Sequence, residues 1–143
     1  MKYLLDTNIV SEAMKITTNP AVNRWMASVA EHDLAISVVG TMEVRRGIEM
    51  MPVGRRRQDL DDWLTNDVPV RFSGRILGID AATADICGTM LGQRHLGAGI
   101  RRIMDFWLAA QATQHGLTVV TRNVKDFQGL GVSLFNPWQE DPA

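Results

Sequence analysis

The stretch YLLDTN, residues 3–8, places a carboxylate directly after a short apolar run. Tyr3, Leu4 and Leu5 suit a buried strand, and Asp6 follows at its end. A buried, unpaired carboxylate is costly, so Asp6 must be solvated, hydrogen-bonded by local backbone, paired with a cation or bound to a metal. The stretch therefore predicts a strand whose end carries either a structural turn or a functional site.

Length and composition indicate a soluble, globular protein. At 143 residues, with 45% hydrophobic and 22% charged residues, the chain has the size and composition of a single domain. Cys87 is the one cysteine and reads as a small buried hydrophobe. The apolar run before Asp6 is too short for a signal peptide, and no stretch is long enough for a membrane span. We expect a cytoplasmic protein with no membrane partner.

The type of basic residue is more informative about possible partners than the net charge of -1, because 12 of the 15 basic residues are Arg. They cluster at 45–46, 55–57 and 101–102. Arg forks match phosphate oxygens two at a time, which suits a nucleic-acid partner. The plainer interpretation is a set of solvated helix faces.

The apolar pattern alternates between strands and helices along the chain. Strands are expected at residues 2–6, 34–37, 76–79, 117–121 and 132–135. Helices are expected at 8–15, 55–66, 81–96 and 103–115, with two more beginning after the caps Asn19 and Ser37 and a loop at 97–99. This order predicts an α/β fold in a single domain, with a mostly parallel sheet flanked by helices on both faces.

Two further acids break their local pattern. Glu43 lies beside the stripe formed by Val44, Ile48 and Met51, and Asp105 shares a helix face with small apolar residues. Each acid alone has a plain explanation, as a turn residue, an exposed helix position or a partner of the helix dipole. Together with Asp6, they could converge at the carboxyl edge of a parallel sheet, where functional groups collect.

Converging carboxylates repel one another unless a cation lies between them, and Mg²⁺ prefers such oxygen ligands. A second polar group follows the expected strand at 117–121, at Thr121, Arg122, Asn123 and Asp126. A zinc site is not indicated, because His32, His95 and His115 lack ligand spacing with one another or with Cys87. The chain also lacks a G-x-x-x-x-G-K phosphate loop and a convincing Ser-His-Asp triad.

Five segments taken in order resemble the PIN-domain ribonuclease toxins of the VapC type, most closely the FitB-like branch. They are LLDTNIVSE, TMEVRRGIE, MDFWLAAQA, VTRNVKDFQGLGV and LFNPW. The resemblance runs from residue 2 to about 138, which suggests a PIN domain over 1–138 and a short tail over 139–143.

The resemblance implies Mg²⁺- or Mn²⁺-dependent endoribonuclease activity by a PIN fold. It carries the roles of the three core acids to Asp6, Glu43 and Asp105 as catalytic metal ligands. It gives supporting polar roles to Thr7, Asn8 and Thr121. The family often has a fourth acid where this chain has Asn123, which leaves open whether Asp126 reaches the site and whether a second metal binds.

The implied biological role is that of the toxin in a type II toxin-antitoxin pair. The expected partners are a cognate antitoxin, an RNA substrate such as tRNA, and operator DNA reached only through the antitoxin. A homodimer is also expected, because Trp25, Trp63 and the methionines at 42, 50 and 51 exceed what a small core needs. The alternative is a catalytically silent PIN module that binds nucleic acid or antitoxin. Phe106 and Trp107, next to Asp105, either narrow the site or belong to the core.

Overall fold

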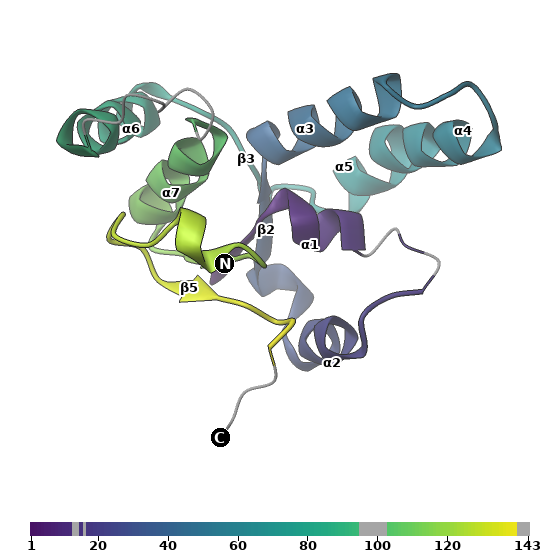
Figure 1. Ribbon diagram of the computed structural model, residues 1–143, viewed down its shortest axis with the longest axis horizontal. Helices are drawn as coiled ribbons and strands as arrows, with labels where there is room; N and C mark the ends of the chain where they lie inside the picture. The colour runs from purple at the N-terminus through teal and green to yellow at the C-terminus, as the bar shows by residue number, and fades with distance from the viewer. Residues whose placement is uncertain (13–14, 16, 95–102, 140–143) are drawn as a thin grey trace.

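The computed structural model describes residues 1–12, 15, 17–94 and 103–139 of the chain (Figure 1). Its sheet consists of the strands β1 (Tyr3–Leu5), β2 (Leu34–Ser37), β3 (Ile76–Leu77), β4 (Thr118–Val120) and β5 (Leu134–Phe135). Its longer helices are α1 (Thr7–Glu12), α2 (Pro20–Ser28), α3 (Val38–Glu49), α4 (Arg55–Asp62), α6 (Ala81–Arg94) and α7 (Ile103–His115). Shorter helical segments are η1 (Glu31–Asp33), η2 (Trp63–Asp67), α5 (Val68–Arg71) and η4 (Val124–Asp126).

The sheet has five strands in the order β3-β2-β1-β4-β5, and every pair is parallel. The strand that the opening sequence predicts is therefore the central one. Leu4 pairs in register with Ala35 on one side and Val119 on the other. The carboxyl ends of β1, β2 and β4 lie at the same edge, and this edge receives the residues that follow each strand.

Consecutive residues of β1 point to opposite faces of the sheet, so the strand contributes to a hydrophobic core on each face. Leu4 packs with Leu108, Ala109 and Ala112 of α7, whereas Leu5 belongs to a second cluster with Ile9 of α1. In Figure 1, α6 and α7 lie on one side of the sheet and α1, α4 and α5 on the other. The predicted parallel sheet with helices on both faces is confirmed.

Capping residues set the helix starts as expected. The side chain of Asn19 accepts hydrogen bonds from the amides of Ala21 and Val22 at 2.9 and 3.3 Å, and Pro20 opens α2. The Ser37 hydroxyl accepts from the amide of Val39 at the start of α3. Gly116, with φ of 67°, follows α7 in the left-handed conformation that favours glycine.

Two elements differ clearly from the expected ranges, and one expected loop cannot be compared. Helical structure does not stop at Asn66, because η2 is a π-turn that leads directly into α5. Pro69 lies at the start of α5, directly after the π-turn. β3 is limited to two residues. The expected loop at 97–99 lies outside the described residues.

The two tryptophans assigned to a possible interface pack against the core instead. Trp25 meets Tyr3 edge-on at 5.2 Å between ring centroids and Phe135 at 5.4 Å. Trp63 packs against the same cluster from η2. By contrast, Met42 and Met50 are exposed. Both tryptophans are partly buried against this cluster, so each contributes to the core, and the expected homodimer stays a prediction.

Three residues for which the sequence offers a structural role, Phe106, Trp107 and Cys87, lie in or against the hydrophobic core. Phe106 is buried, and Trp107 packs against the clusters around α7, so both belong to the core rather than to the site. Cys87 is buried, and burial raises the pKa of its thiol, as expected for an unreactive cysteine. No helix in the described ranges is long and apolar enough to cross a membrane.

Candidate functional site

The carboxylate of Asp6 is held where β1 ends, almost inaccessible to solvent. Its Oδ1 accepts the Thr7 amide at 2.7 Å, and its Oδ2 accepts the hydroxyl of Thr121 at 2.8 Å. Thr121 follows β4, the neighbouring strand, so two adjacent strand ends determine the position of one carboxylate. Burial is the largest influence on Asp6 and raises its pKa, although the two hydrogen bonds oppose the rise and the charge of Asp126 adds to it.

Glu43 reaches the same edge from the middle of α3. Its Oε1 accepts the hydroxyl of Thr7 at 3.0 Å, so Thr7 binds Asp6 with its amide and Glu43 with its side chain. Burial raises the pKa of Glu43, the Thr7 hydrogen bond lowers it, and the nearby charge of Asp6 raises it further. Both acids therefore occupy positions that disfavour ionisation in the metal-free protein.

Gly40 allows α3 to approach Thr7. A Cβ at position 40 would lie 3.3 Å from the Thr7 hydroxyl oxygen, which is closer than nine in ten real contacts of a Cβ atom. Gly47, two turns further along α3, has open space where a Cβ would lie. Gly40 therefore has a specific steric role beside the acids, which the sequence analysis did not identify.

Asp105 joins the two other acids from the first turn of α7. A cavity of about 400 Å³, here called the acid cavity, is bordered by side chains from five parts of the chain. Its lining consists of Asp6, Thr7, Asn8, Ser11, Glu12, Lys15, Glu43, Asp105, Arg122, Asn123 and Trp138. The three acids that the sequence singles out thus face one cavity at the carboxyl edge of the sheet.

Some of the predicted supporting polar residues line the acid cavity, and others do not. Asn8 and Asn123 line the acid cavity, and the amide of Asn123 donates to the Thr121 hydroxyl oxygen at 3.0 Å. Thr121 itself is buried behind Asp6. Asp126, in η4, is not among the lining residues, although its charge influences Asp6.

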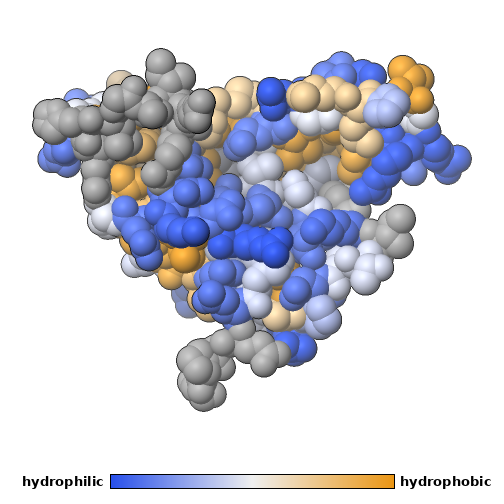
Figure 2. Space-filling view, in the orientation of Figure 1, coloured by the Kyte–Doolittle hydropathy of each residue, from blue (hydrophilic) through white to orange (hydrophobic). Residues whose placement is uncertain are grey.

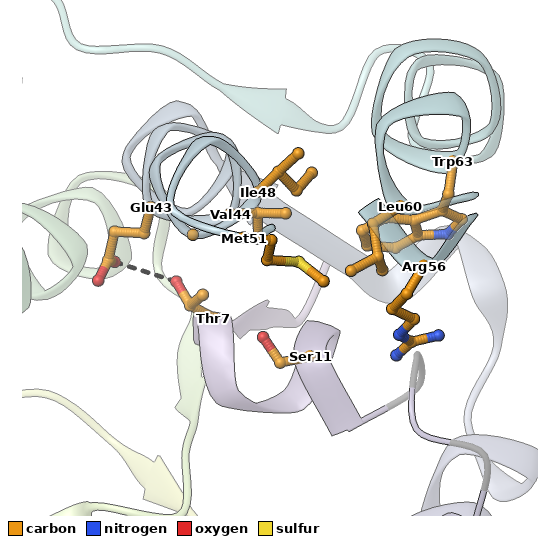
Figure 3. A pocket seen from close by; sticks show the side chains of 10 residues that line it. Thr7, Ser11, Glu43, Val44, Ile48, Met51, Arg56, Leu60 and Trp63 are labelled. Atoms are coloured by element: carbon orange, nitrogen blue, oxygen red, sulfur yellow. Dashed lines mark hydrogen bonds between the residues drawn. The ribbon is translucent and has the colours of Figure 1, made fainter. Parts of the chain in front are cut away.

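An apolar groove adjoins the acid cavity and shares Thr7, Ser11 and Glu43 with it. The groove has a volume of about 280 Å³ and runs between α1, α3 and α4 (Figure 3). Its remaining lining is Val44, Gly47, Ile48, Met51, Arg56, Leu60 and Trp63. In Figure 3, Glu43 and Thr7 lie at one end, and Leu60, Trp63 and Arg56 form the opposite wall. A ligand in the groove would therefore reach the acids at one end.

Two ion pairs join the helices on either side of this groove. Arg45 of α3 binds Asp61 of α4 at 2.9 Å, and Arg57 of α4 binds Glu49 of α3 at 2.9 Å. The Arg57 guanidinium also donates to the carbonyl of Met51 in the turn between them. These contacts assign structural roles to two of the arginines that the sequence left as candidate phosphate ligands.

A family model for the PIN domain matches residues 3–131. The chain belongs to the PIN domain family. Toxin FitB of Neisseria gonorrhoeae is 32% identical, with 96% of this chain and 99% of FitB aligned. VapC ribonuclease Y4jK of Sinorhizobium fredii is 30% identical over 95% of this chain and 97% of its own. A structure of FitAB bound to an IR36 DNA fragment superposes with a TM-score of 0.86 at 30% identity and covers 97% of both chains.

Within the PIN family, this chain therefore groups with the VapC and FitB toxins of toxin-antitoxin systems. The donor atoms of the acid cavity determine which metal ion it could hold. They are carboxylate, hydroxyl and amide oxygens, with no His or Cys among the lining residues. Such a set suits a hard divalent cation and does not suit zinc.

The side chains of this PIN domain would have to rearrange to hold such an ion. Within the described ranges, no three Asp, Glu, His or Cys side chains are grouped closely enough to share one ion. Thr7 is hydrogen-bonded to both Asp6 and Glu43. Movement of Glu43 is one such rearrangement, because the Thr7 hydroxyl holds its carboxylate in the metal-free protein.

The close contact at Gly40 predicts that Gly40→Ala disturbs the acids, whereas Gly47→Ala does not. Both substitutions improve helix propensity by up to about 1 kcal/mol, but only the first forces Thr7 to move. We expect Gly47→Ala to raise Tm by about 2–4 °C and Gly40→Ala to raise it less. Thermal unfolding in EDTA measures both, and an equal or larger gain for Gly40→Ala would contradict the steric role.

The raised pKa of Glu43 predicts that Glu43→Gln stabilises the metal-free protein at neutral pH. The folded state binds this proton more tightly than the unfolded chain, where the ordinary value is 4.5. Wild-type stability therefore falls as pH rises from 4.5 through the folded pKa, and the Gln variant escapes this loss. We expect Glu43→Gln to have a higher Tm than wild type at neutral pH, and this gain should disappear below pH 4.5.

Thermal unfolding in EDTA across this pH range provides the test. Asp85→Asn, at an exposed position on α6, is the matched control for removal of one negative charge. A Glu43→Gln variant that is less stable than wild type at neutral pH would show that the Thr7 hydrogen bond outweighs the cost of burial.

Proposed function

We propose that this chain is a divalent-metal-dependent endoribonuclease that acts as the toxin of a toxin-antitoxin pair. The observation that carries the proposal is the convergence of Asp6, Glu43 and Asp105 on one cavity lined by oxygen donors. Relatives named as toxin and as ribonuclease support the reaction class. Mg²⁺ or Mn²⁺ fits the donor set.

In this proposal, Asp6, Glu43 and Asp105 hold the metal. A divalent ion held there would supply Lewis-acid chemistry, which would lower the pKa of a bound water and offset charge on the leaving oxygen of the RNA phosphodiester. Thr121 and the Thr7 amide fix the orientation of Asp6. In the metal-free protein, Thr7 also holds Glu43, and metal binding would release Glu43 from this hydrogen bond. Asn8 and Asn123, which line the cavity, orient waters or carboxylates.

Cleavage by purified, antitoxin-free protein tests the reaction. We expect discrete cuts in total bacterial RNA with Mg²⁺ or Mn²⁺, and a loss of at least about 100-fold on Asp105→Asn, because metal ligands contribute several kcal/mol to such reactions. Asp85→Asn, an exposed acid outside the cavity, should cleave at the wild-type rate.

Titration with Mn²⁺ separates the enzyme from the silent module. The enzyme should bind Mn²⁺ in a manner that depends on Asp105, with Tm rising as ion is added. Wild-type protein that neither cleaves RNA nor binds Mn²⁺ would reject the enzyme and favour a binding module.

We further propose that the apolar groove receives the antitoxin. The groove is lined by Val44, Ile48, Met51, Leu60 and Trp63, and it ends at Glu43. An amphipathic antitoxin segment with a cation at one end would bury its apolar face there and place the cation beside the acids. The solved FitAB complex, at 30% identity over nearly the whole chain, supports an antitoxin partner.

The groove assignment predicts that Leu60→Lys weakens antitoxin binding by about tenfold or more, because it places a charge against an apolar partner. RNA cleavage by the free variant should persist, since Leu60 does not line the acid cavity. Val53→Lys, at a position that is 92% exposed, is the matched control. Calorimetric titration with the cognate antitoxin measures the change, and unaltered affinity of Leu60→Lys would contradict the assignment.

A further inference from the structure

Two cations line the acid cavity together with the carboxylates. Lys15, which follows α1, and Arg122, which follows β4, both border the cavity. Across the middle of the face in Figure 2, hydrophilic residues dominate. Four carboxylates and two cations line the cavity, so a single divalent ion would leave the lining formally neutral. The cations are therefore placed where a polyanionic ligand would meet the acids.

Lys15 is held in place by a buried carboxylate. Glu12, at the end of α1, is 4% exposed and accepts the backbone amide of Asn19 at 2.8 Å. The Lys15 ammonium binds the other Glu12 oxygen at 2.7 Å. The Lys15 side chain is 55% exposed, and an ammonium has three donors, so one bond to Glu12 does not exhaust them. Glu12 thus fixes a cation whose other face is open to solvent.

Arg122 is held by different means. Its amide donates to the Asn8 side chain at 3.4 Å, and its carbonyl accepts from Asn136 at 3.3 Å. Its guanidinium carbon lies 5.4 Å from the centre of the Trp138 ring. Stacking on an aromatic face leaves the in-plane donors of a guanidinium directed outward, where they match phosphate oxygens. The Arg122 backbone also adjoins Thr121, which binds Asp6 directly.

We propose that Lys15 and Arg122 bind backbone phosphates of the RNA strand that flank the bond to be cleaved, with Glu12 and Trp138 as their positioning residues. This inference rests on the proposed nuclease function and names the residues that hold its substrate. The physical reason is that carboxylates alone repel a phosphodiester backbone. Cations on the same cavity wall offset that repulsion next to the reacting phosphate.

The alternative role for the same contacts is purely structural. Lys15 would then only neutralise buried Glu12, and Arg122 would only cover Trp138. A structural role predicts changes in stability but no change in the dependence of RNA binding on salt. Phosphate contacts predict the opposite, because each one releases counterions from the strand.

The test measures binding of a fluorescein-labelled single-stranded RNA in EDTA by anisotropy over a series of KCl concentrations. The variants are Arg122→Gln and the double substitution Glu12→Gln/Lys15→Gln, which removes both charges and avoids an unpaired buried carboxylate. Arg55→Gln is the control, since Arg55 is 91% exposed, outside the cavity and paired with Asp59. Thermal unfolding identifies any variant that fails to fold.

Each test variant should weaken RNA binding and reduce the slope of log K against log[KCl] by about 0.7, the value for one phosphate contact on a single strand. Arg55→Gln should retain the wild-type slope. Arg122→Lys, which keeps the charge, should restore most of the slope. Wild-type slopes in folded Arg122→Gln and Glu12→Gln/Lys15→Gln proteins would overturn the inference.

Cleavage kinetics distinguish this failure from failure of the proposed function. With metal present, the test variants should raise KM more than they lower kcat. If wild type cleaves RNA and the variants keep its KM, the phosphate contacts are rejected and the nuclease stands. If wild type neither cleaves RNA nor binds Mn²⁺, the nuclease is rejected, and the salt slopes alone decide whether these cations hold RNA.

Discussion

The burial of the Asp6 carboxylate at the end of the central strand is the constraint on which the site depends. A carboxylate that is nearly inaccessible must have hydrogen-bond partners, and Asp6 obtains them from the Thr7 amide and from Thr121 on the neighbouring strand. Thr7 also donates its hydroxyl to Glu43, so the residue that binds Asp6 positions the second acid in the metal-free protein. The parallel sheet thus sets the positions of the acids through the ends of its strands.

This arrangement has a cost in the metal-free protein. Burial raises the pKa of both Asp6 and Glu43, and the charge of Asp6 raises the pKa of Glu43 further. Structural acids are usually placed so that ionisation is favoured, as it is for Glu12 beside Lys15. A pair of acids kept in an unfavourable state is what a cation-binding or catalytic site requires, because a bound ion recovers the energy.

Local signals in the sequence were sufficient for much of the fold and for the identity of the acids. The side chains of Asn19 and Ser37 accept hydrogen bonds from nearby amides, and this starts the helices that follow them. Gly116 ends a helix because glycine readily adopts the positive φ found there. The out-of-pattern positions of Glu43 and Asp105 were visible from helical periodicity, and both do border the cavity with Asp6. The role of each acid as a metal ligand remains a prediction.

What the sequence did not predict depends on contacts between distant residues. Nothing near Gly40 indicates that its missing side chain makes room for Thr7, 33 positions earlier. Glu12 reads as an ordinary helix residue, but its carboxylate is buried and accepts the backbone amide of Asn19. The helix continues beyond Asn66 because Trp63 and Val68 pack into the second core cluster.

The most direct test of the account is crystallography of the protein in Mn²⁺, with data collected for the anomalous signal of the metal. The account predicts an anomalous peak within ligand distance of Asp6, Glu43 and Asp105, with the Glu43 carboxylate turned away from the Thr7 hydroxyl. An acid cavity without a peak at saturating Mn²⁺, with the Thr7 hydrogen bonds intact, would contradict it.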